Sequence, residues 1–520
     1  MFEIRSRLLT PLLSLLLLPA LSCSSKPDAD TLVMIIESSP TNLDPRVGID
    51  AFSERIDILL FDDLLTRDEH FNVQPGLADR WEIPDPLTYM FHLHRGVRFH
   101  DGRPLTSKDV KWTFDGLLQG RVRSTKSAIY RFVDHIEAPD DYTVIFKMKE
   151  PFATLLWNLS GGAMGIVPYG SSAEEMTSHP VGSGPFRFVS AEQDKEVILE
   201  RNEAYWGEKA HLKRIRFAVV PDTTTRALEL RKGSADLESN ALTTDMVLTL
   251  QRDPTLEVAH GPGSILAYLA LNCRDPYLKD VRVRQALAYA IDRRPMLQYL
   301  MRGFARPADS ILPPESWAYN KDVPRYDYNP ARARQLLDEA GHPAVNGIRF
   351  HLTMKISTIE ETTRLLATVL QQQLRDVGIT LDIHSFDFAT FFADVTKGAF
   401  ELYSLRWIGG NEDPDIFEYA FHTSKFPPHG ANRSFYSNPR LDTLIDRART
   451  QLDQDTRQRL YAEIQTILAQ DLPYINLWYV DNVVVHSKRV QNLQLNASGN
   501  YDFLKTAELT SEKTVVSKTP

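Results

Sequence analysis

The chain has 520 residues, of which 43% are hydrophobic and 24% are charged, and its formal net charge is −9 at pH 7. This length exceeds what one hydrophobic core usually holds, so two or three domains are expected in a protein of ordinary globular composition. The charge balance provides no basic footprint for nucleic acid and no acidic run typical of disorder, so we expect no nucleic-acid partner.

The N-terminus has the pattern of a secretory signal. Two arginines precede an apolar run over residues 8–18, and Ser22-Cys23 follows. The run is shorter than the ~20 apolar residues of a membrane-spanning helix, and a small residue directly before a cysteine marks a cleavage point. We therefore expect residues 1–22 to be a signal peptide and residues 23–30 a short polar tether. A cysteine at this place resembles the acylated first residue of a bacterial lipoprotein; an ordinary signal peptide that contains a cysteine is the alternative.

The remaining chain has the hydrophobic periodicity of mixed α/β structure. Residues 31–36 are apolar on both faces, which predicts an interior strand. Residues 89–94 alternate in polarity and predict a half-buried strand, followed by a turn at Asp101-Gly102 and a helix capped by Thr106 or Ser107. Further strands are expected at residues 215–220, 348–354, 379–384, 399–405 and 474–485, helices at 280–290, 331–340, 360–377 and 456–469, and a disordered tail at 505–520.

Three histidines near this turn are candidate metal ligands. His92 and His94 share one face of the expected strand, and His100-Asp101 follows. An exposed strand face explains them better, because no carboxylate is evident that would orient the imidazoles. The chain also lacks the common hydrolase and nucleotide-binding motifs. We therefore expect no metal, no cofactor and no enzyme.

Several segments, in register along most of the chain, resemble one known family. The longest is residues 77–114, and the strings VGSGPF at 181–186 and NEAYWG at 202–207 are the most specific. Residues 215–222, 226–236, 271–272 and 281–287 continue the pattern. The chain is thus similar to the extracytoplasmic solute-binding proteins of family 5, the peptide/nickel type that includes dipeptide- and oligopeptide-binding proteins and feeds ABC transporters.

The resemblance implies an α/β, two-lobed periplasmic-binding-protein fold of type II with an extra inserted domain and a cleft that closes by hinge motion. The first lobe is expected to be discontinuous and the second continuous. The expected segments are 31–65, 180–272 and 481–504 for lobe 1, 66–179 for the inserted domain, and 273–480 for lobe 2.

The same resemblance implies a monomeric protein in the periplasm or at the cell surface, anchored to the membrane by lipidated Cys23. It would capture a peptide or peptide-like ligand and deliver it to an ABC transporter membrane permease. The alternatives are a solute without a free amine, such as a glycan, metal complex or heme, or a secreted sensor or chaperone without transport. If Cys23 carries lipid, Cys273 has no disulfide partner, and we expect it to be a small buried hydrophobe in a strand.

The segment LRWIGGNEDPD at residues 405–415 is the strongest candidate for ligand contact, because it follows an expected strand and opens a helix. It resembles the peptide-binding branch, in which a Trp is followed three residues later by an Asp that pairs with the ligand's α-ammonium. Here the Trp is Trp407 and the acid's position holds Gly410, next to Gly409. Either Glu412 or Asp413 replaces the acid, or the ligand lacks a free amine.

Each of these residues also has a purely structural interpretation. Asp413 with Pro414 is a well-matched helix start and needs no ligand, so Glu412 is the better anchor. Trp407 either stacks on a ligand or fills a gap in the core. Arg364 and Arg406 are the candidate partners of a ligand carboxylate, unless they are simply solvated.

Overall fold

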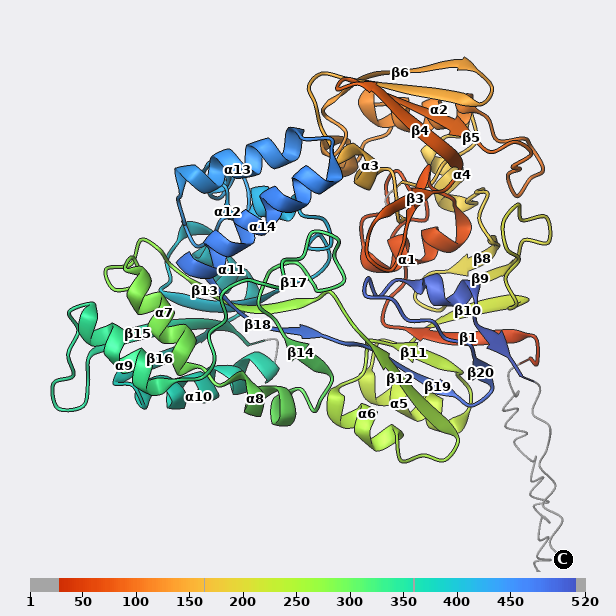
Figure 1. The fold of residues 1–520 in the computed structure, drawn as a ribbon. Coiled ribbons are helices and arrows are strands. Elements are labelled where there is room, and N and C mark those ends of the chain that lie inside the picture. The colour runs from red at the N-terminus through yellow and green to blue at the C-terminus, as the bar shows by residue number, and fades with distance from the viewer. Residues whose placement is uncertain (1–27, 163, 359–360, 511–520) are drawn as a thin grey trace, which may run out of the picture.

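The computed structural model describes residues 28–162, 164–358 and 361–510. Five sheets organise this part of the chain, and the three larger ones have seven, six and four strands. In Figure 1 the six-stranded sheet and its helices occupy the left, the seven-stranded sheet the lower right, and the four-stranded sheet the upper right. None of the described helices is long and apolar enough to cross a membrane. The signal peptide, Cys23 and residues 511–520 lie outside the described residues, so the expectations for them remain predictions.

The seven-stranded sheet is built around β1, whose residues are all buried. This strand pairs in parallel with β10 on one side and β11 on the other, so it is the interior strand that the sequence predicted. Helices α1 (Ala51–Leu60), α5 (Thr223–Lys232) and α6 (Thr244–Leu250) belong to the same lobe. The strand order is β12 (Leu256–Gly261), β19 (Asn482–Ser487), β11 (Leu237–Ser239), β1 (Thr31–Ile36), β10 (Arg214–Val219), β9 (Glu196–Arg201), β8 (Phe186–Glu192).

The six-stranded sheet is covered by helices on both faces. Its order is β14 (Ala305–Pro307), β18 (Tyr474–Val480), β13 (Leu266–Leu271), β17 (Leu402–Trp407), β15 (Phe350–Ser357), β16 (Ile379–Phe386). Alternate residues of β13 point to opposite faces. One face packs against α7 (Val281–Ala290), α9 (Pro330–Glu339) and α10 (Glu361–Arg375), and the other against α11 (Phe388–Lys397), α12 (Ile416–Phe421), α13 (Pro439–Thr450) and α14 (Gln454–Asp471).

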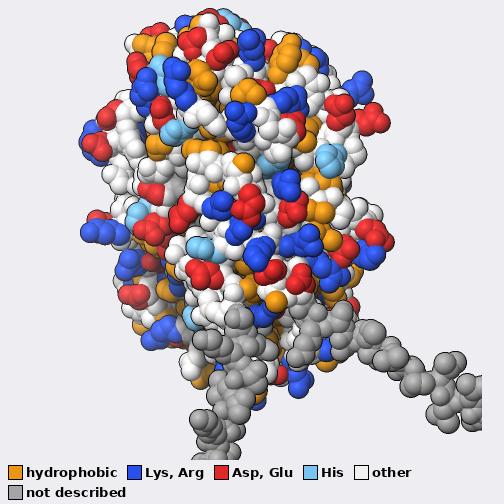
Figure 2. All heavy atoms as spheres, turned by 90° about the vertical axis from the view of Figure 1, so that its right-hand side faces the viewer, with side chains coloured by type: hydrophobic (Ala, Val, Ile, Leu, Met, Phe, Trp, Pro, Cys, Tyr) orange, Lys and Arg blue, Asp and Glu red, His pale blue; other side chains and the backbone are white. Residues whose placement is uncertain are grey.

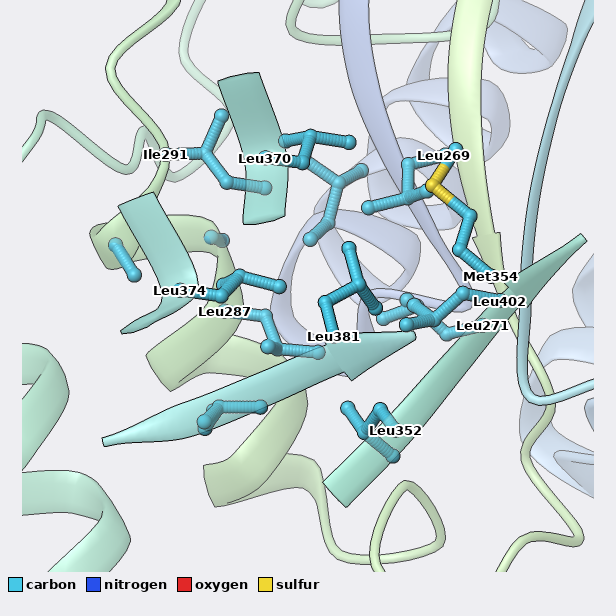
Figure 3. Packing of buried hydrophobic residues seen from close by; sticks show 14 of the residues in the cluster. Leu269, Leu271, Leu287, Ile291, Leu352, Met354, Leu370, Leu374, Leu381 and Leu402 are labelled. Carbon is cyan, nitrogen blue, oxygen red and sulfur yellow. The ribbon is translucent and has the colours of Figure 1, made fainter. Parts of the chain in front are cut away.

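Figure 3 shows the first of these faces. Leu269 and Leu271 of β13 meet Leu352 and Met354 of β15 and Leu381 of β16, and the side chains of α7 and α10 close over them. All are almost fully buried. Burial of such side chains stabilises a fold by about 1.5–3 kcal/mol each, so this layer is a rigid support for the loops at the strand ends.

The four-stranded antiparallel sheet is the core of the inserted domain. Its order is β4 (Ala78–Asp85), β5 (Thr88–Leu93), β7 (Thr143–Met148), β6 (Val133–Asp140), and α2 (Ser107–Leu118) packs against it. The expected alternation is confirmed, since Tyr89, Phe91 and Leu93 are buried. The expected position of the cap, Thr106, is confirmed, and the backbone N–H and hydroxyl of Thr106 donate to the Asp109 carboxylate at 2.7 and 2.9 Å, as in a capping box.

The chain crosses between the two large sheets twice, and the crossing segments lie side by side. β13 pairs with β17 and β18, so the first crossing lies at residues 262–265 and not at the expected boundary after residue 272. The expected strand 474–485 is two strands in different sheets, β18 and β19, separated by Asp481. The backbone N–H of Val480 donates to the carbonyl of Ile265 at 2.8 Å. These two segments form the hinge of a two-lobed fold.

The end of the described chain is ordered further than expected. A turn of 3₁₀-helix, η4 (Tyr501–Lys505), is followed by β21 (Glu508–Leu509), which pairs with β20 (Val490–Gln491). The prediction of disorder from residue 505 is therefore wrong for residues 505–510. The reason is that Leu504 and Ala507 are buried against the seven-stranded lobe, which a short polar stretch of sequence does not reveal.

The visible face of the inserted domain and the seven-stranded lobe carries basic and acidic side chains intermixed (Figure 2). The seven-stranded lobe also has exposed cross-strand and local ion pairs, such as Arg187–Glu200 and Lys195–Glu192. Exposed pairs of this kind stabilise little, but they leave the face without an extended surface of one charge.

Candidate ligand site between the lobes

The loop after β17 carries Glu412 to a cavity between the lobes. Glu412 is only 8% exposed although it is charged and lies in a loop. The cavity measures about 330 Å³, and its other walls come from the opposite side of the hinge, including Asp63, Arg67, Asp502 and Lys505. The expectation that this segment would lie at a strand end facing a cleft agrees with this placement of Glu412.

Two groups hold the Glu412 carboxylate. The hydroxyl of Ser264, in the first crossing segment, donates to Oε1 at 2.9 Å. Nη1 of Arg67 lies 3.8 Å from Oε2, across the cavity. Burial raises the pKa of Glu412, and Arg67 and the Ser264 hydrogen bond partly oppose that rise. The charge of Glu412 therefore depends on what occupies the cavity beside it.

Arg67, at the end of β2 (Leu65–Arg67), is fixed in place by the inserted domain. Its guanidinium lies 3.4 Å from the centre of the Trp157 ring and donates to Oγ and the carbonyl of Ser160 at 2.9 and 2.7 Å. Sequence reasoning missed Arg67, because a single arginine in a polar stretch has no distinguishing pattern. A stacked, hydrogen-bonded guanidinium is a preorganised partner for a carboxylate.

The two specific family strings converge on Asp62, another wall of the cavity. The hydroxyls of Ser183 and Tyr205 donate to its carboxylate, each at 2.9 Å, and Trp206 Nε1 donates at 2.8 Å. Gly184 is required at the turn, because a Cβ there would lie 2.6 Å from the Leu60 carbonyl carbon at the end of α1. These strings therefore fix the floor of the cavity.

The three histidines have separate partners. His92 Nε2 lies 3.2 Å from Glu82, and His94 packs on the Trp206 ring. The backbone N–H of Gly182 donates to Nδ1 of His100, whose Nε2 lies 3.1 Å from the Gly184 carbonyl. No group of three potential metal-binding side chains occurs among the described residues. These two hydrogen bonds connect the inserted domain to the glycine turn. They require a neutral His100 imidazole with its proton on Nε2, because Nδ1 accepts and Nε2 donates.

Trp407 ends β17 and is half-buried. One face stacks on Tyr268, with ring centres 6.2 Å apart, and its edge meets Tyr419. The Arg433 guanidinium lies 5.9 Å from the Trp407 ring centre. Trp407 therefore packs against the core of lobe 2 on one side, and its buried indole N–H has no acceptor among the described residues.

Gly409 and Gly410 form the exposed turn between Trp407 and Glu412. Their φ angles are +67° and +73°, and a Cβ on either would meet nothing within 4 Å. An aspartate side chain at residue 410 would therefore have room. Its backbone, however, would have to adopt the left-handed conformation, which is unfavourable for residues other than glycine.

Asp413 stabilises the loop and does not reach the cavity. Its Oδ1 accepts the backbone N–H of Asp415 at 2.7 Å, and burial raises its pKa to about 6. The helix expected to begin at Asp413-Pro414-Asp415 begins later, at Ile416 of α12, because the first turns close through three-residue hydrogen bonds from Ile416 to Asp413 and from Phe417 to Pro414.

Neither of the two predicted arginines lines the cavity that Glu412 enters. Arg364 is exposed on α10 and pairs with Glu361 of the same helix at 3.1 Å. Arg406 is exposed on β17, and adjacent strand residues point to opposite faces, so it points away from Trp407. Cys273 lies just after β13, not in it; it is only partly buried, and burial raises its thiol pKa to about 11. It is therefore a poor nucleophile.

Comparison with known proteins identifies the family. The family model described as bacterial extracellular solute-binding proteins, family 5 Middle, matches residues 72–427. The glutathione-binding protein GsiB of Pectobacterium atrosepticum is 31% identical over 491 residues, 92% of this chain and 94% of that protein. Among solved structures, HbpA2 from Haemophilus parasuis has a TM-score of 0.83 at 26% identity, covering 92% of this chain and 100% of that one.

A second solved structure holds a ligand. DppA from Helicobacter pylori, in complex with the peptide STSA, has a TM-score of 0.72 at 28% identity and covers 92% of this chain and 98% of that one. The match to the family model extends over more than half of the 520 residues and agrees with the two-lobed architecture. The chain belongs to family 5 of the bacterial extracellular solute-binding proteins.

Proposed function

We propose that this protein captures a peptide or peptide-like solute between its lobes and delivers it to an ABC transporter permease, without catalysing a reaction. GsiB is named for glutathione, which is a tripeptide, and the H. pylori DppA structure holds a peptide. The observation that carries the proposal is the buried carboxylate of Glu412, which enters the cavity between the lobes from the loop that follows Trp407.

The charge of this cavity suits a cationic group such as a peptide α-ammonium. The acids Asp62, Asp63, Asp68, Glu69, Glu412 and Asp502 line it, against the basic residues Arg67 and Lys505. An ammonium that approaches Glu412 would replace Arg67 as the neighbour of Oε2, and a charge-assisted hydrogen bond would form. Glu412 would then act in place of the acid that Gly410 does not provide.

A ligand without a free amine is the second candidate. Glu412 accepts a hydrogen bond from Ser264 and faces Arg67, so its charge is partly compensated within the protein itself. An amine-blocked peptide, a glycan, a metal complex or heme would use the remaining walls. A sensor or chaperone without a permease would use the same cleft.

We further propose that the protein is monomeric and is held at the outer side of a membrane by lipid on Cys23. The sequence pattern before Cys23 supports this, together with the extracellular location in the family's name. Stable anchoring by this route takes more than one acyl chain.

Identification of the bound solute tests the proposed function. Protein purified from its native host is denatured, and the released small molecules are analysed by mass spectrometry. We expect peptides or peptide-like compounds at about one equivalent per chain. Release of only a glycan, a porphyrin or a metal chelate would contradict the peptide proposal and leave the family unchanged.

A further inference from the structure

Arg433 lies in an aromatic surface of lobe 2 and has no carboxylate partner among the described residues. Its guanidinium is 5.0 Å from the ring centre of Phe392 and 5.9 Å from that of Trp407. The phenol groups of Tyr268, Tyr403 and Tyr474 lie close enough to interact electrostatically with it, and that of Tyr268 shares a hydrogen bond with it. In contrast, Arg449 and Lys425 of the same lobe both pair with Glu418. A half-buried guanidinium whose described neighbours are aromatic rings and neutral phenols lacks the anion that usually accompanies it.

The surface around Arg433 is exposed and apolar. Phe388 and Tyr419 are each 45% exposed and Ile408 is 68% exposed. Phe388 stacks on Phe392 and Tyr419 meets Trp407, the two rings that the guanidinium faces, and Ile408 follows Trp407 in the chain. Exposed apolar side chains grouped around a polar centre are typical of a binding site.

This surface adjoins a second cavity between the domains. Tyr419 lines a space of about 500 Å³ whose other walls include Ile129 and Phe152 of the inserted domain. Trp407 leads directly into the loop of Glu412. The aromatic surface is therefore joined to this second cavity through Tyr419, which contacts Trp407, and to Glu412 through the short loop that follows Trp407.

We propose that Arg433, with Trp407, Phe392 and Tyr419 around it, binds a carboxylate of the solute that carries an aromatic or other apolar group beside it. This inference rests on the proposed solute-binding function and specifies one end of the ligand. The guanidinium donates to the carboxylate oxygens, and the neighbouring rings cover the apolar group. The indole N–H of Trp407, which has no acceptor among the described residues, is a second donor at the same place. Arg433 thus takes the role expected of Arg364 and Arg406.

Two probes that differ only in their charge test this proposal without using Glu412. N-acetylphenylalanine has a carboxylate and no free amine, and N-acetylphenylalanine amide has neither a carboxylate nor a free amine. Their affinities for the purified mature protein are measured by ligand-detected NMR titration. We expect the wild-type protein to bind the acid about tenfold more tightly than the amide, since a desolvated ion pair is lost with the amide.

The variants separate recognition from structure. Arg433→Gln should abolish the preference for the acid while binding of the amide stays the same, and Arg433→Lys should keep part of the preference. Arg274→Gln is the matched control, because Arg274 also stacks on aromatic rings of this lobe, those of Phe426 and Phe435, but lies away from Trp407. It should leave the preference unchanged.

Three results would overturn the proposal: equal binding of acid and amide by the wild-type protein, no binding of either, or an equal loss of both in Arg433→Gln with an altered circular dichroism spectrum. Failure of the peptide proposal is distinguishable, because it would appear as a non-peptide among the released solutes while the acid probe still required Arg433.

Discussion

Oε2 of Glu412 and Nη1 of Arg67 lie 3.8 Å apart across the cavity between the lobes, and the two residues reach it from opposite sides of the hinge. Both side chains are largely buried. An ion pair in this position exists only while the lobes are together, and its carboxylate is the group proposed to meet the ligand. Lobe closure and ligand binding therefore both involve the negative charge of Glu412.

Glu412→Gln should weaken binding of a free-amine dipeptide by about 2–5 kcal/mol, because the ammonium would lose its charged partner inside a closed cleft. It should hardly change the affinity for the N-acetylated form of the same dipeptide. Calorimetry with the two ligands and the two proteins completes a cycle, in which any effect of Arg67 losing its partner is common to both ligands and cancels. Wild-type protein that binds the acetylated dipeptide as tightly as the free one would exclude Glu412 as an ammonium anchor.

Ligand binding should reduce the radius of gyration of the protein. Two crossing segments connect the lobes within the described part of the chain, so relative motion about them is the default for such an arrangement. Small-angle scattering of protein stripped of solute, and of the same sample with the released solute restored, measures the change. An unchanged radius at confirmed saturation would rule out hinge closure.

Gly263 should be the residue most sensitive to substitution in the hinge. A Cβ at Gly263 would lie 2.0 Å from the carbonyl oxygen of Val480, so the two crossing segments would have to separate. Gly263→Ala should cost about 1–3 kcal/mol in the free energy of unfolding, as overpacking usually does. Gly261→Ala is the matched control, because its Cβ would lie at an ordinary 3.6 Å from Leu495. Denaturation that ranks the two variants equally would contradict this account of the hinge.

The proposed lipid anchor makes Cys23→Ser a direct test of localisation. Without the thiol no acyl chain can be attached, so the variant should appear in the soluble extracytoplasmic fraction, while the wild-type protein stays with membranes. Intact-mass measurement of membrane-derived protein should give a chain that begins at residue 23 with added acyl mass. An unmodified chain that begins at another residue would contradict the assignment.

Local patterns predicted local structure well, and their limits are physical. The strand at residues 88–93 and the cap at Thr106 follow from side-chain alternation and hydrogen-bonding groups within a few residues. The first lobe crossing was misplaced because β13 is buried on both faces, and such an apolar run fits the interior of either large sheet equally well. Which sheet it joins depends on partners that lie far away in the sequence.

The same distinction holds for the site. Glu412 could be selected from its segment because the expected acid was missing two residues earlier. Arg67 and Arg433 could not be selected from the sequence, because their neighbours are distant in the chain and come together only in the fold. These neighbours are Trp157 and Glu412 for Arg67, and Trp407 and Phe392 for Arg433. Arg364 was a reasonable donor by residue type, but its helix faces solvent where that residue lies.

The last prediction concerns the pH dependence of stability. Burial raises the pKa of Asp413 from 3.8 to about 6 in the folded protein. The contribution of Asp413 to stability is therefore fully present below pH 3.8 and is lost as the pH rises through about 6, by an amount on the order of 3 kcal/mol. Asp413→Asn keeps an oxygen for the Asp415 N–H but cannot ionise, so its melting temperature relative to wild type should rise between pH 4.5 and pH 7.5. Asp387→Asn is the control, because the Thr390 hydrogen bonds lower the pKa of that exposed helix-capping carboxylate, and its difference from wild type should stay constant over the same range. A constant difference for Asp413→Asn as well would mean that Asp413 remains ionised throughout, with Arg457 as its compensating charge.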